Sequence, residues 1–173
     1  MIIKTAGLSD FDSVIAFYHD LIDSMQDAEY RPKWEKDVYP SRQFIYDSIA
    51  RNELIATVMD GEIAGAMVVN HDCAEAYDKA AWKTDANRDQ AAVIHILAVA
   101  ARHQGRGLAK KMVAYAVDDS RKKGMKAIRL DVLAQNKPAH HLYISAGFAY
   151  IGTVQIFYED TGLTDFMLYE FVL

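Results

Sequence analysis

The chain has 173 residues, of which 51% are hydrophobic and 25% are charged, a composition typical of one ordinary globular domain. Its formal net charge of -5 argues against a dedicated nucleic-acid-binding protein, because such proteins are usually basic. The single cysteine, Cys73, excludes an intrachain disulfide, and no apolar run reaches the ~20 residues of a membrane span. We therefore expect a single domain over residues 1–173, cytoplasmic, with no nucleic-acid or membrane partner.

The charge is distributed unevenly along the chain. Residues 102–129 hold nine basic and two acidic side chains, a local charge of +7, whereas the remaining residues carry -12. One short segment is therefore suited to meet a negatively charged ligand, and the rest of the chain is not.

The first half of the chain predicts three strands and two helices. Apolar residues at helical spacing follow the candidate cap Ser9-Asp10, and Asp60-Gly61 between two apolar runs predicts a tight hairpin. The expected elements are strand 2–6, helix 10–25, an irregular segment 26–40, helix 41–51, and strands 54–59 and 62–70.

The second half begins with a polar segment, residues 71–90, in which we expect at most a short helix. The elements expected after it are strand 91–99, helix 105–123, strand 126–133, helix 136–146, and strands 148–157 and 164–172. This order predicts an α/β fold with a mixed sheet and flanking helices. Residues 91–133 should form a right-handed parallel crossover.

The most informative stretch is Gln104-Gly105-Arg106-Gly107-Leu108-Ala109, which follows a buried strand and opens a helix. Two glycines let backbone N–H groups converge on an anion, and the helix N-terminus adds positive dipole character. The stretch lacks the Lys and Ser or Thr of a P-loop and the third glycine of a dinucleotide-binding fingerprint. A diphosphate-binding loop is favoured over a plain glycine turn with a solvated basic face.

These residues resemble the acetyl-CoA loop of the GCN5-related N-acetyltransferase (GNAT) superfamily, Gln/Arg-x-x-Gly-x-Gly/Ala. A second signature of that family, Asn-x-x-Ala-x-x-Leu-Tyr-x-x-x-Gly-Phe, follows in the expected order. It is matched by Asn136, Ala139, Leu142, Tyr143, Gly147 and Phe148. The resemblance implies an acyl-CoA N-acyltransferase fold, whose central mixed sheet is mostly antiparallel and flanked by helices.

The resemblance also implies roles for individual residues, with acetyl-CoA as co-substrate. The strand ending in Leu97, Ala98 and Val99 is expected to carry a bulge and to bind pantetheine through its backbone. The amides of Gln104, Gly105, Arg106, Gly107, Leu108 and Ala109 are expected to hold the pyrophosphate. Asn136, with Ala139 in the same motif, should bind the pantetheine arm or order the nearby backbone. Tyr143 should protonate the departing CoA thiolate.

The general base is less well defined by the sequence. Some family members carry a glutamate at the position of Val93, so that base is missing here. His95 lies two residues further on and is a candidate base or water-relay residue, although a lone histidine in an apolar strand is more often a core residue. Glu159 and Asp160 are further candidates, and a water chain without a single essential base is also consistent with the sequence.

The expected reaction is transfer of an acetyl group to a primary amine of a small molecule or to a protein amino group, by direct attack in a ternary complex. Asp72, Glu75 and Asp78 could attract a cationic amine beside Tyr77 or Trp82, or could belong to a solvated insertion. No metal site is expected, since adjacent His140 and His141 point to different helix faces. The alternatives are a non-catalytic acyl-CoA-binding module and, third, a nucleic-acid-binding domain. A homodimer is expected only from the resemblance.

Overall fold

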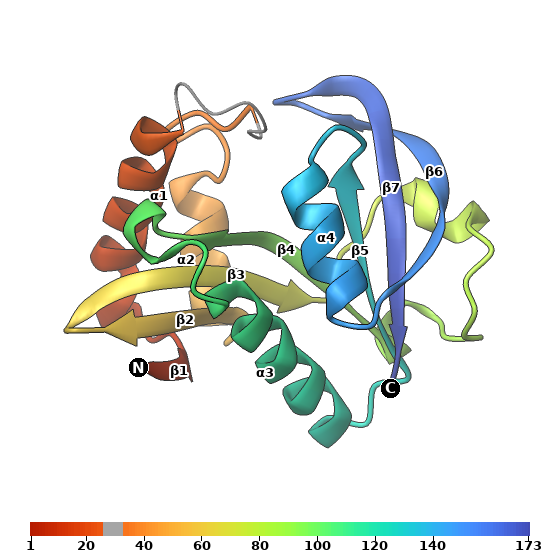
Figure 1. Cartoon of the computed structure of the whole chain (residues 1–173), viewed down its shortest axis with the longest axis horizontal. Helices are drawn as coiled ribbons and strands as arrows, with labels where there is room; N and C mark the ends of the chain where they lie inside the picture. Colours follow the sequence, from red (N-terminus) through yellow and green to blue (C-terminus); the bar gives the residue numbers. More distant parts are fainter. Residues whose placement is uncertain (26–32) are drawn as a thin grey trace. The chain divides into compact units, whose positions relative to one another are not determined.

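The computed structural model describes residues 1–25 and 33–173 (Figure 1), so part of the predicted irregular segment 26–40 lies outside the described residues. It is a mixed α/β structure with a sheet in the strand order β1-β2-β3-β4-β5-β7-β6, which confirms the predicted fold class. The contacts divide the chain into two compact units, residues 1–69 with 95–112 and residues 70–94 with 113–173. Strand β4 (Ala91–Val99) and helix α3 (Leu108–Lys122) each contribute to both units.

The first unit contains an antiparallel arrangement of three strands followed by the second half of β4. β1 (Ile2–Thr5) pairs with β2 (Leu54–Met59), which pairs in turn with β3 (Glu62–Asn70). Asp60 and Gly61 join β2 to β3 with φ angles of 52° and 82°. Two successive positive φ angles match the right-handed twist of the flanking strands, so the predicted hairpin is confirmed.

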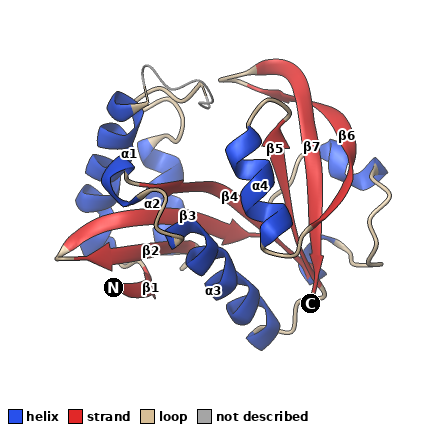
Figure 2. Ribbon diagram, in the orientation of Figure 1, coloured by secondary structure: helices blue, strands red, loops and turns tan. Residues whose placement is uncertain are grey.

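Two helices of the first unit, α1 (Phe11–Ser24) and α2 (Arg42–Ala50), cover its strands (Figures 1 and 2). Their apolar faces share one buried core with β2, β3 and the end of β4. It includes Val14, Tyr18, Leu21, Ile45, Ile49, Leu54, Ala66, Val68 and Ile96. The side chain of Ser41 caps α2 by accepting a hydrogen bond from the Phe44 N–H at 3.1 Å, as expected for a helix start.

The second unit starts from a short parallel pairing of β4 with β5 (Ala127–Leu133), from Ala91↔Ala127 to Val93↔Arg129. β5 then pairs antiparallel with β7 (Gly162–Val172), and β7 pairs with β6 (Ala149–Tyr158). Helix α4 (Lys137–Ser145) lies between β5 and β6 in the chain. The parallel arrangement expected for residues 91–133 is confirmed.

Alternate residues of β7 face two different neighbours, because successive side chains of a strand point to opposite sides. Tyr169 contacts α4, where its hydroxyl donates to His140 Nδ1 at 2.9 Å. Phe166 and Leu168 pack with Tyr77, from the short 3₁₀ helix η2 (Glu75–Lys79). The polar segment 71–90 and α4 therefore cover opposite faces of β7.

A buried ion pair fixes segment 71–90 to the sheet. Arg129 Nε donates to Glu170 Oε1 at 3.0 Å, and the two side chains are only 8% and 0% exposed. Glu170 Oε2 also accepts the backbone N–H groups of Lys83 and Thr84, while the guanidinium of Arg129 donates to the carbonyls of Thr84 and Ala86. Burying two charges costs free energy, and here each charge is compensated by several hydrogen-bonding partners.

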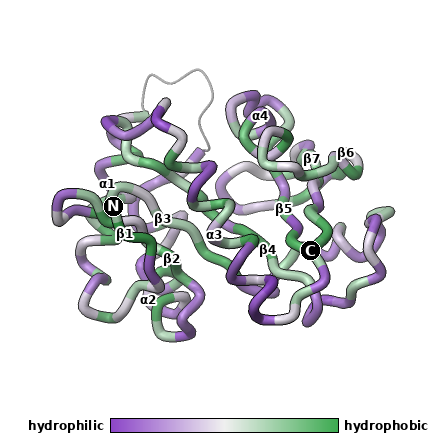
Figure 3. The backbone as a smooth tube through the Cα atoms, turned by 60° about the horizontal axis from the view of Figure 1, so that its bottom comes forward, coloured by the Kyte–Doolittle hydropathy of each residue, from purple (hydrophilic) through white to green (hydrophobic). Residues whose placement is uncertain are grey.

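Most expected elements differ from the structure by one or two residues at their ends, and two segments differ more. Helix α3 begins at Leu108 rather than at 105, because Gly105 and Gly107 have positive φ angles that a helix cannot contain. Segment 71–90 holds two 3₁₀ turns, η2 and η3 (Arg88–Gln90). Hydrophilic and hydrophobic stretches alternate along the chain (Figure 3), and no helix of the described residues has the length and apolar character needed to cross a membrane.

The ion pair predicts a large stability effect for an isosteric substitution. We expect Glu170→Gln to lower the free energy of unfolding by about 3 kcal/mol, because the buried Arg129 loses its counter-charge. Asp118→Asn is the matched control, since Asp118 forms an exposed ion pair with Arg121 on α3. This variant should change the free energy of unfolding by no more than about 0.5 kcal/mol. Urea unfolding of the two variants measures both values, and equal losses would contradict this role of the pair.

Candidate active site

The glycine loop of the first unit connects the short helix η4 (Ala101–His103) to α3. Gly105 and Gly107 have φ angles of 71° and 73°, a left-handed backbone that residues with a Cβ rarely adopt. A Cβ at either position would meet no atom within 4 Å, so open space lies above both glycines. The loop therefore places backbone N–H groups at an exposed helix N-terminus, as an anion site requires.

The side chain of Gln104 holds the start of this loop, because its Nε2 donates to the Val99 carbonyl at 3.0 Å. This side-chain contact leaves the backbone amide of Gln104 out, so pyrophosphate binding by that amide stays a prediction. At the other end, Leu108 is buried and begins α3, and Ala109 is half-buried. The loop is thus anchored on both sides of its exposed residues 105–107.

The basic residues around the loop fall into two groups. Arg102 forms an ion pair with Glu62 and so is partly neutralised within the protein. Arg106, Lys110 and Lys111 are exposed, and none of the described residues forms an ion pair with them. These three cations remain available to an anionic ligand.

Strand β4 carries an irregularity where the resemblance implied a bulge. Ile96 has a φ of 46°, which is unusual for a β-branched residue and strains the backbone. The buried hydroxyl of Tyr18 on α1 donates to the Ile96 carbonyl at 3.0 Å. Tyr18 therefore fixes the backbone just before Leu97, Ala98 and Val99.

Tyr143 lies on α4 in the second unit and is buried. Its ring packs edge-on against Phe148 at a centroid distance of 5.4 Å and lies 6.4 Å from the ring of Tyr169. Burial raises the pKa of Tyr143 well above its ordinary value, and the negative charge of Asp131 raises this pKa further. The phenol therefore stays protonated at neutral pH, the form that a proton donor needs.

Asn136 caps the helix that carries Tyr143. Its side-chain oxygen accepts the Ala139 N–H at 3.2 Å. Asn136 thereby orders the first turn of α4 through the Ala139 amide, and its binding to the pantetheine arm stays a prediction.

The candidate bases lie in different places. His95 is half-buried in the part of β4 that belongs to the first unit, directly before Ile96, whereas Val93 packs in the core of the second unit. Glu159 is exposed and Asp160 half-buried, both in the turn between β6 and β7. A base role for any of these residues stays a prediction.

Sequence reasoning missed Asp131, a half-buried acid on β5. Its Oδ2 accepts hydrogen bonds from the hydroxyls of Tyr77 at 2.9 Å and Tyr158 at 3.0 Å. Burial raises the pKa of Asp131, although both hydrogen bonds oppose the rise. The available signal was one acid in the apolar strand 126–133, two residues from Arg129 and so on the same face.

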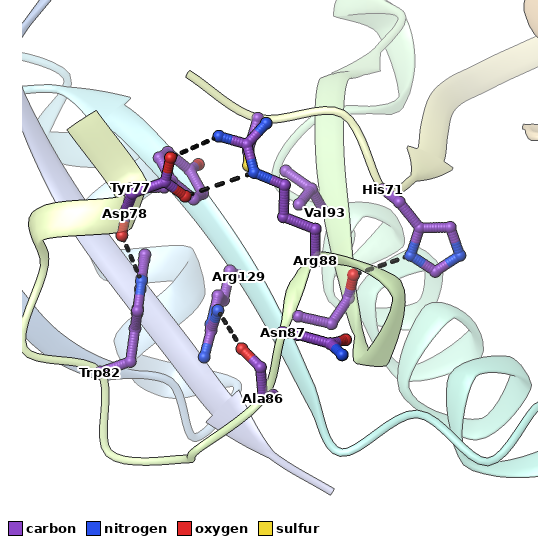
Figure 4. Close-up of a pocket in the computed structure, with 11 residues that line it drawn as sticks. His71, Tyr77, Asp78, Trp82, Ala86, Asn87, Arg88, Val93 and Arg129 are labelled. Carbon is purple, nitrogen blue, oxygen red and sulfur yellow. Dashed lines mark hydrogen bonds and ion pairs between the residues drawn. The ribbon is translucent and has the colours of Figure 1, made fainter. Parts of the chain in front are cut away.

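A cavity of about 190 Å³ lies in the second unit (Figure 4). It is lined by His71, Cys73, Tyr77, Asp78, Trp82, Ala86, Asn87, Arg88, Ala91, Val93 and Arg129. Its two arginines are already engaged: Arg88 pairs with Asp78 at 2.7 Å, and Arg129 also lies 4.4 Å above the Trp82 ring. Of the acids expected to attract an amine, Asp78 is thus neutralised within the protein.

Comparisons with known proteins point to one family. The model of the acetyltransferase (GNAT) family matches residues 16–148. Streptothricin acetyltransferase from Streptomyces lavendulae is 30% identical over 107 residues, which are 62% of this chain and 49% of that protein. The chain thus spans about half the length of the curated relative it matches.

Solved structures share the whole fold. A Staphylococcus aureus Mu50 protein is 26% identical with a TM-score of 0.71, and 99% of both chains is covered. A GNAT-family acetyltransferase from Streptococcus agalactiae has 21% identity and a TM-score of 0.82, covering 99% of this chain and 95% of that one. A Salmonella typhimurium protein solved with acetyl-CoA has 17% identity and a TM-score of 0.73, covering 100% of this chain and 94% of that one.

The glycine loop makes a prediction for Gly107→Ala. An alanine at a φ of 73° should lower the free energy of unfolding by about 1 kcal/mol. We also expect it to weaken CoA binding at least ~10-fold, because relaxing the strain redirects the amides that meet the diphosphate. Gly7→Ala is the control, since Gly7 has an extended backbone with a φ of -102°. Calorimetric titration with CoA measures the affinity, and wild-type affinity in Gly107→Ala would contradict the assignment.

Proposed function

We propose, since this chain belongs to the acetyltransferase (GNAT) family, that it transfers an acetyl group from acetyl-CoA to a primary amine, of a small molecule or of a protein. The amine attacks directly while both substrates are bound. The observation that carries this proposal is the open, left-handed glycine loop at the start of α3, with three exposed cations that no described residue neutralises.

The glycine loop fits a diphosphate in both geometry and charge. The amides of residues 104–109 would hold the diphosphate of acetyl-CoA, and Arg106, Lys110 and Lys111 would supply positive charge around it. A Cβ at Gly105 or Gly107 would enter the space that the ligand needs, so the two glycines serve both the turn and the approach of the phosphate oxygens.

The backbone after Ile96 has the second binding role in this proposal. Backbone groups of Leu97, Ala98 and Val99 would bind the pantetheine arm, with Tyr18 holding the carbonyl just before them. An N–H group of this segment can also stabilise the negative charge that develops on the acetyl carbonyl oxygen. Asn136 and the Ala139 amide support the same arm by fixing the first turn of α4.

Acetyl-CoA supplies an activated thioester, and the protein has to move two protons. Tyr143 donates a proton to the departing sulfur, and its raised pKa keeps it protonated for that step. His95 accepts the proton of the attacking amine, directly or through water, because imidazole exchanges protons readily near neutral pH. Val93 cannot replace it, since an aliphatic side chain accepts no proton.

The acceptor is proposed to be a primary amine. The streptothricin acetyltransferase relative is named for streptothricin as its acceptor, and by analogy a small-molecule amine is favoured over a protein amino group. The homodimer and the cytoplasmic location stay predictions.

Tyr143→Phe tests the proposed catalytic acid. We expect kcat to fall by ~10²–10⁴-fold, with acetyl-CoA affinity unchanged, because only the proton donor is removed. In the wild-type enzyme kcat should not decline on the alkaline side until well above pH ~10, since the pKa of Tyr143 is raised above the ordinary tyrosine value. Tyr46→Phe on the exposed face of α2 is the control. Release of free CoA thiol reports the rates, and an unchanged kcat in Tyr143→Phe would favour a non-catalytic acyl-CoA-binding module.

His95→Gln tests the proposed base. The variant should lower kcat by ~10²-fold, because glutamine cannot accept the amine proton. The KM for acetyl-CoA should not change. Release of free CoA thiol at varied acetyl-CoA concentration measures both constants, and a wild-type kcat in His95→Gln would exclude His95 as the base.

A further inference from the structure

Asp131 presents one fixed and one unused oxygen. Its Oδ2 takes both tyrosine hydrogen bonds, from Tyr77 on η2 and Tyr158 on β6. Its Oδ1 accepts no hydrogen bond from any residue that the structure describes. Two tyrosines from distant parts of the chain thus orient this carboxylate and leave one acceptor oxygen for another donor.

The carboxylate lies in apolar surroundings, and no cation of residues 1–25 or 33–173 forms an ion pair with it. Tyr77 and Tyr158 belong to a cluster with Ile156, Phe166 and Leu168. The arginines of the same region are committed, Arg129 to Glu170 and Arg88 to Asp78. Burial raises the pKa of Asp131 because no described cation compensates its charge. A half-buried carboxylate without a described counter-charge gains most from a ligand with a full positive charge.

We propose that Asp131, held by Tyr77 and Tyr158, is a subsite that binds an ammonium group of the acceptor, so that the enzyme selects acceptors with a second amino group. This inference rests on the proposed function, because it assumes that an amine is the acceptor. The ligand class is an aliphatic diamine or polyamine, or a small molecule with several amino groups.

Each part of the cluster suits this class of ligand. Oδ1 of Asp131 can accept one ammonium N–H, because none of the described residues donates a hydrogen bond to it. The aromatic and aliphatic side chains packed around the carboxylate would strengthen the ion pair by excluding water. An anionic group would be repelled by Asp131, and a neutral hydroxyl would leave its charge uncompensated.

Tyr143 is a further reason to place this subsite near the reaction. The charge of Asp131 is one of the two causes that raise the pKa of Tyr143, so the carboxylate lies within electrostatic range of the proposed acid. In this proposal the ammonium group bound at Asp131 belongs to the same acceptor molecule whose other amine reacts. Asp131 acts here as a specificity residue and does not take part in proton transfer.

The test compares diaminobutane with aminobutanol, two acceptors of equal chain length that differ in one ammonium group. For the wild-type enzyme we expect kcat/KM to favour diaminobutane by at least ~10-fold. Asp131→Asn should remove most of this preference by raising the KM for diaminobutane at least ~10-fold, with its kcat, the kinetics of aminobutanol and the KM for acetyl-CoA unchanged. The amide side chain of this variant retains a carbonyl oxygen for both tyrosines, so the fold should persist.

Two further measurements keep the result unambiguous. Asp131→Asn should be at least as stable as the wild type at neutral pH, because the raised pKa of Asp131 means that its charged form weakens the folded state, and this penalty disappears as the carboxyl is protonated at acidic pH. Asp118→Asn, on the exposed face of α3, should retain the preference for diaminobutane.

Binding of diaminobutane is also measured by calorimetry without acetyl-CoA, which separates the subsite from catalysis. Binding to the wild type that is lost in Asp131→Asn supports the subsite even if no amine is acetylated, an outcome that would count against the proposed function alone. An undiminished preference in Asp131→Asn, an equal loss for both acceptors, or no binding of diaminobutane to the wild type would overturn the subsite.

Discussion

The buried pair of Arg129 and Glu170 is the interaction on which the second unit depends most. It joins β5 to β7 and uses its remaining hydrogen-bonding capacity on the backbone of residues 83–86. A loop with many polar side chains is thereby held against a sheet without a helix or a disulfide. Because Tyr77 belongs to the same segment, the pair also determines where its hydroxyl meets Asp131.

Because successive side chains of a strand point to opposite sides, the two faces of the sheet carry different groups. On one face, Tyr169 of β7 packs with α4 and its neighbour Tyr143, which we propose as the proton donor. On the other face, the polar side chains of β5 meet segment 71–90, and Asp131 is the one without a cationic partner among the described residues. The proposed acid is thus carried by α4 on one face of this sheet, and the proposed acceptor subsite is formed by β5, β6 and segment 71–90.

The features that could be predicted from sequence are those set by local chemistry. Gly105 and Gly107 indicated a glycine loop that opens a helix, Asp60-Gly61 a hairpin, and Asn136 an ordered helix start, because each depends on residues a few positions away. The Asp131 and Glu170 contacts join residues 54 and 87 positions apart. No local pattern encodes such pairs, so they were visible only as isolated acids in apolar strands. The sequence pattern placed Gly105 and Gly107 inside the expected helix 105–123, because the spacing of apolar residues does not report φ angles.

The central claim is that the chain moves an acetyl group from a thioester to nitrogen. The most direct measurement is carbon NMR of the reaction of the purified protein with acetyl-CoA labelled at the acetyl carbonyl and diaminobutane. We predict that the thioester signal is replaced by an amide carbonyl signal at a rate proportional to enzyme concentration. A thioester signal that persists at the rate of the enzyme-free control, across a panel of small amines and peptides, would contradict the claim.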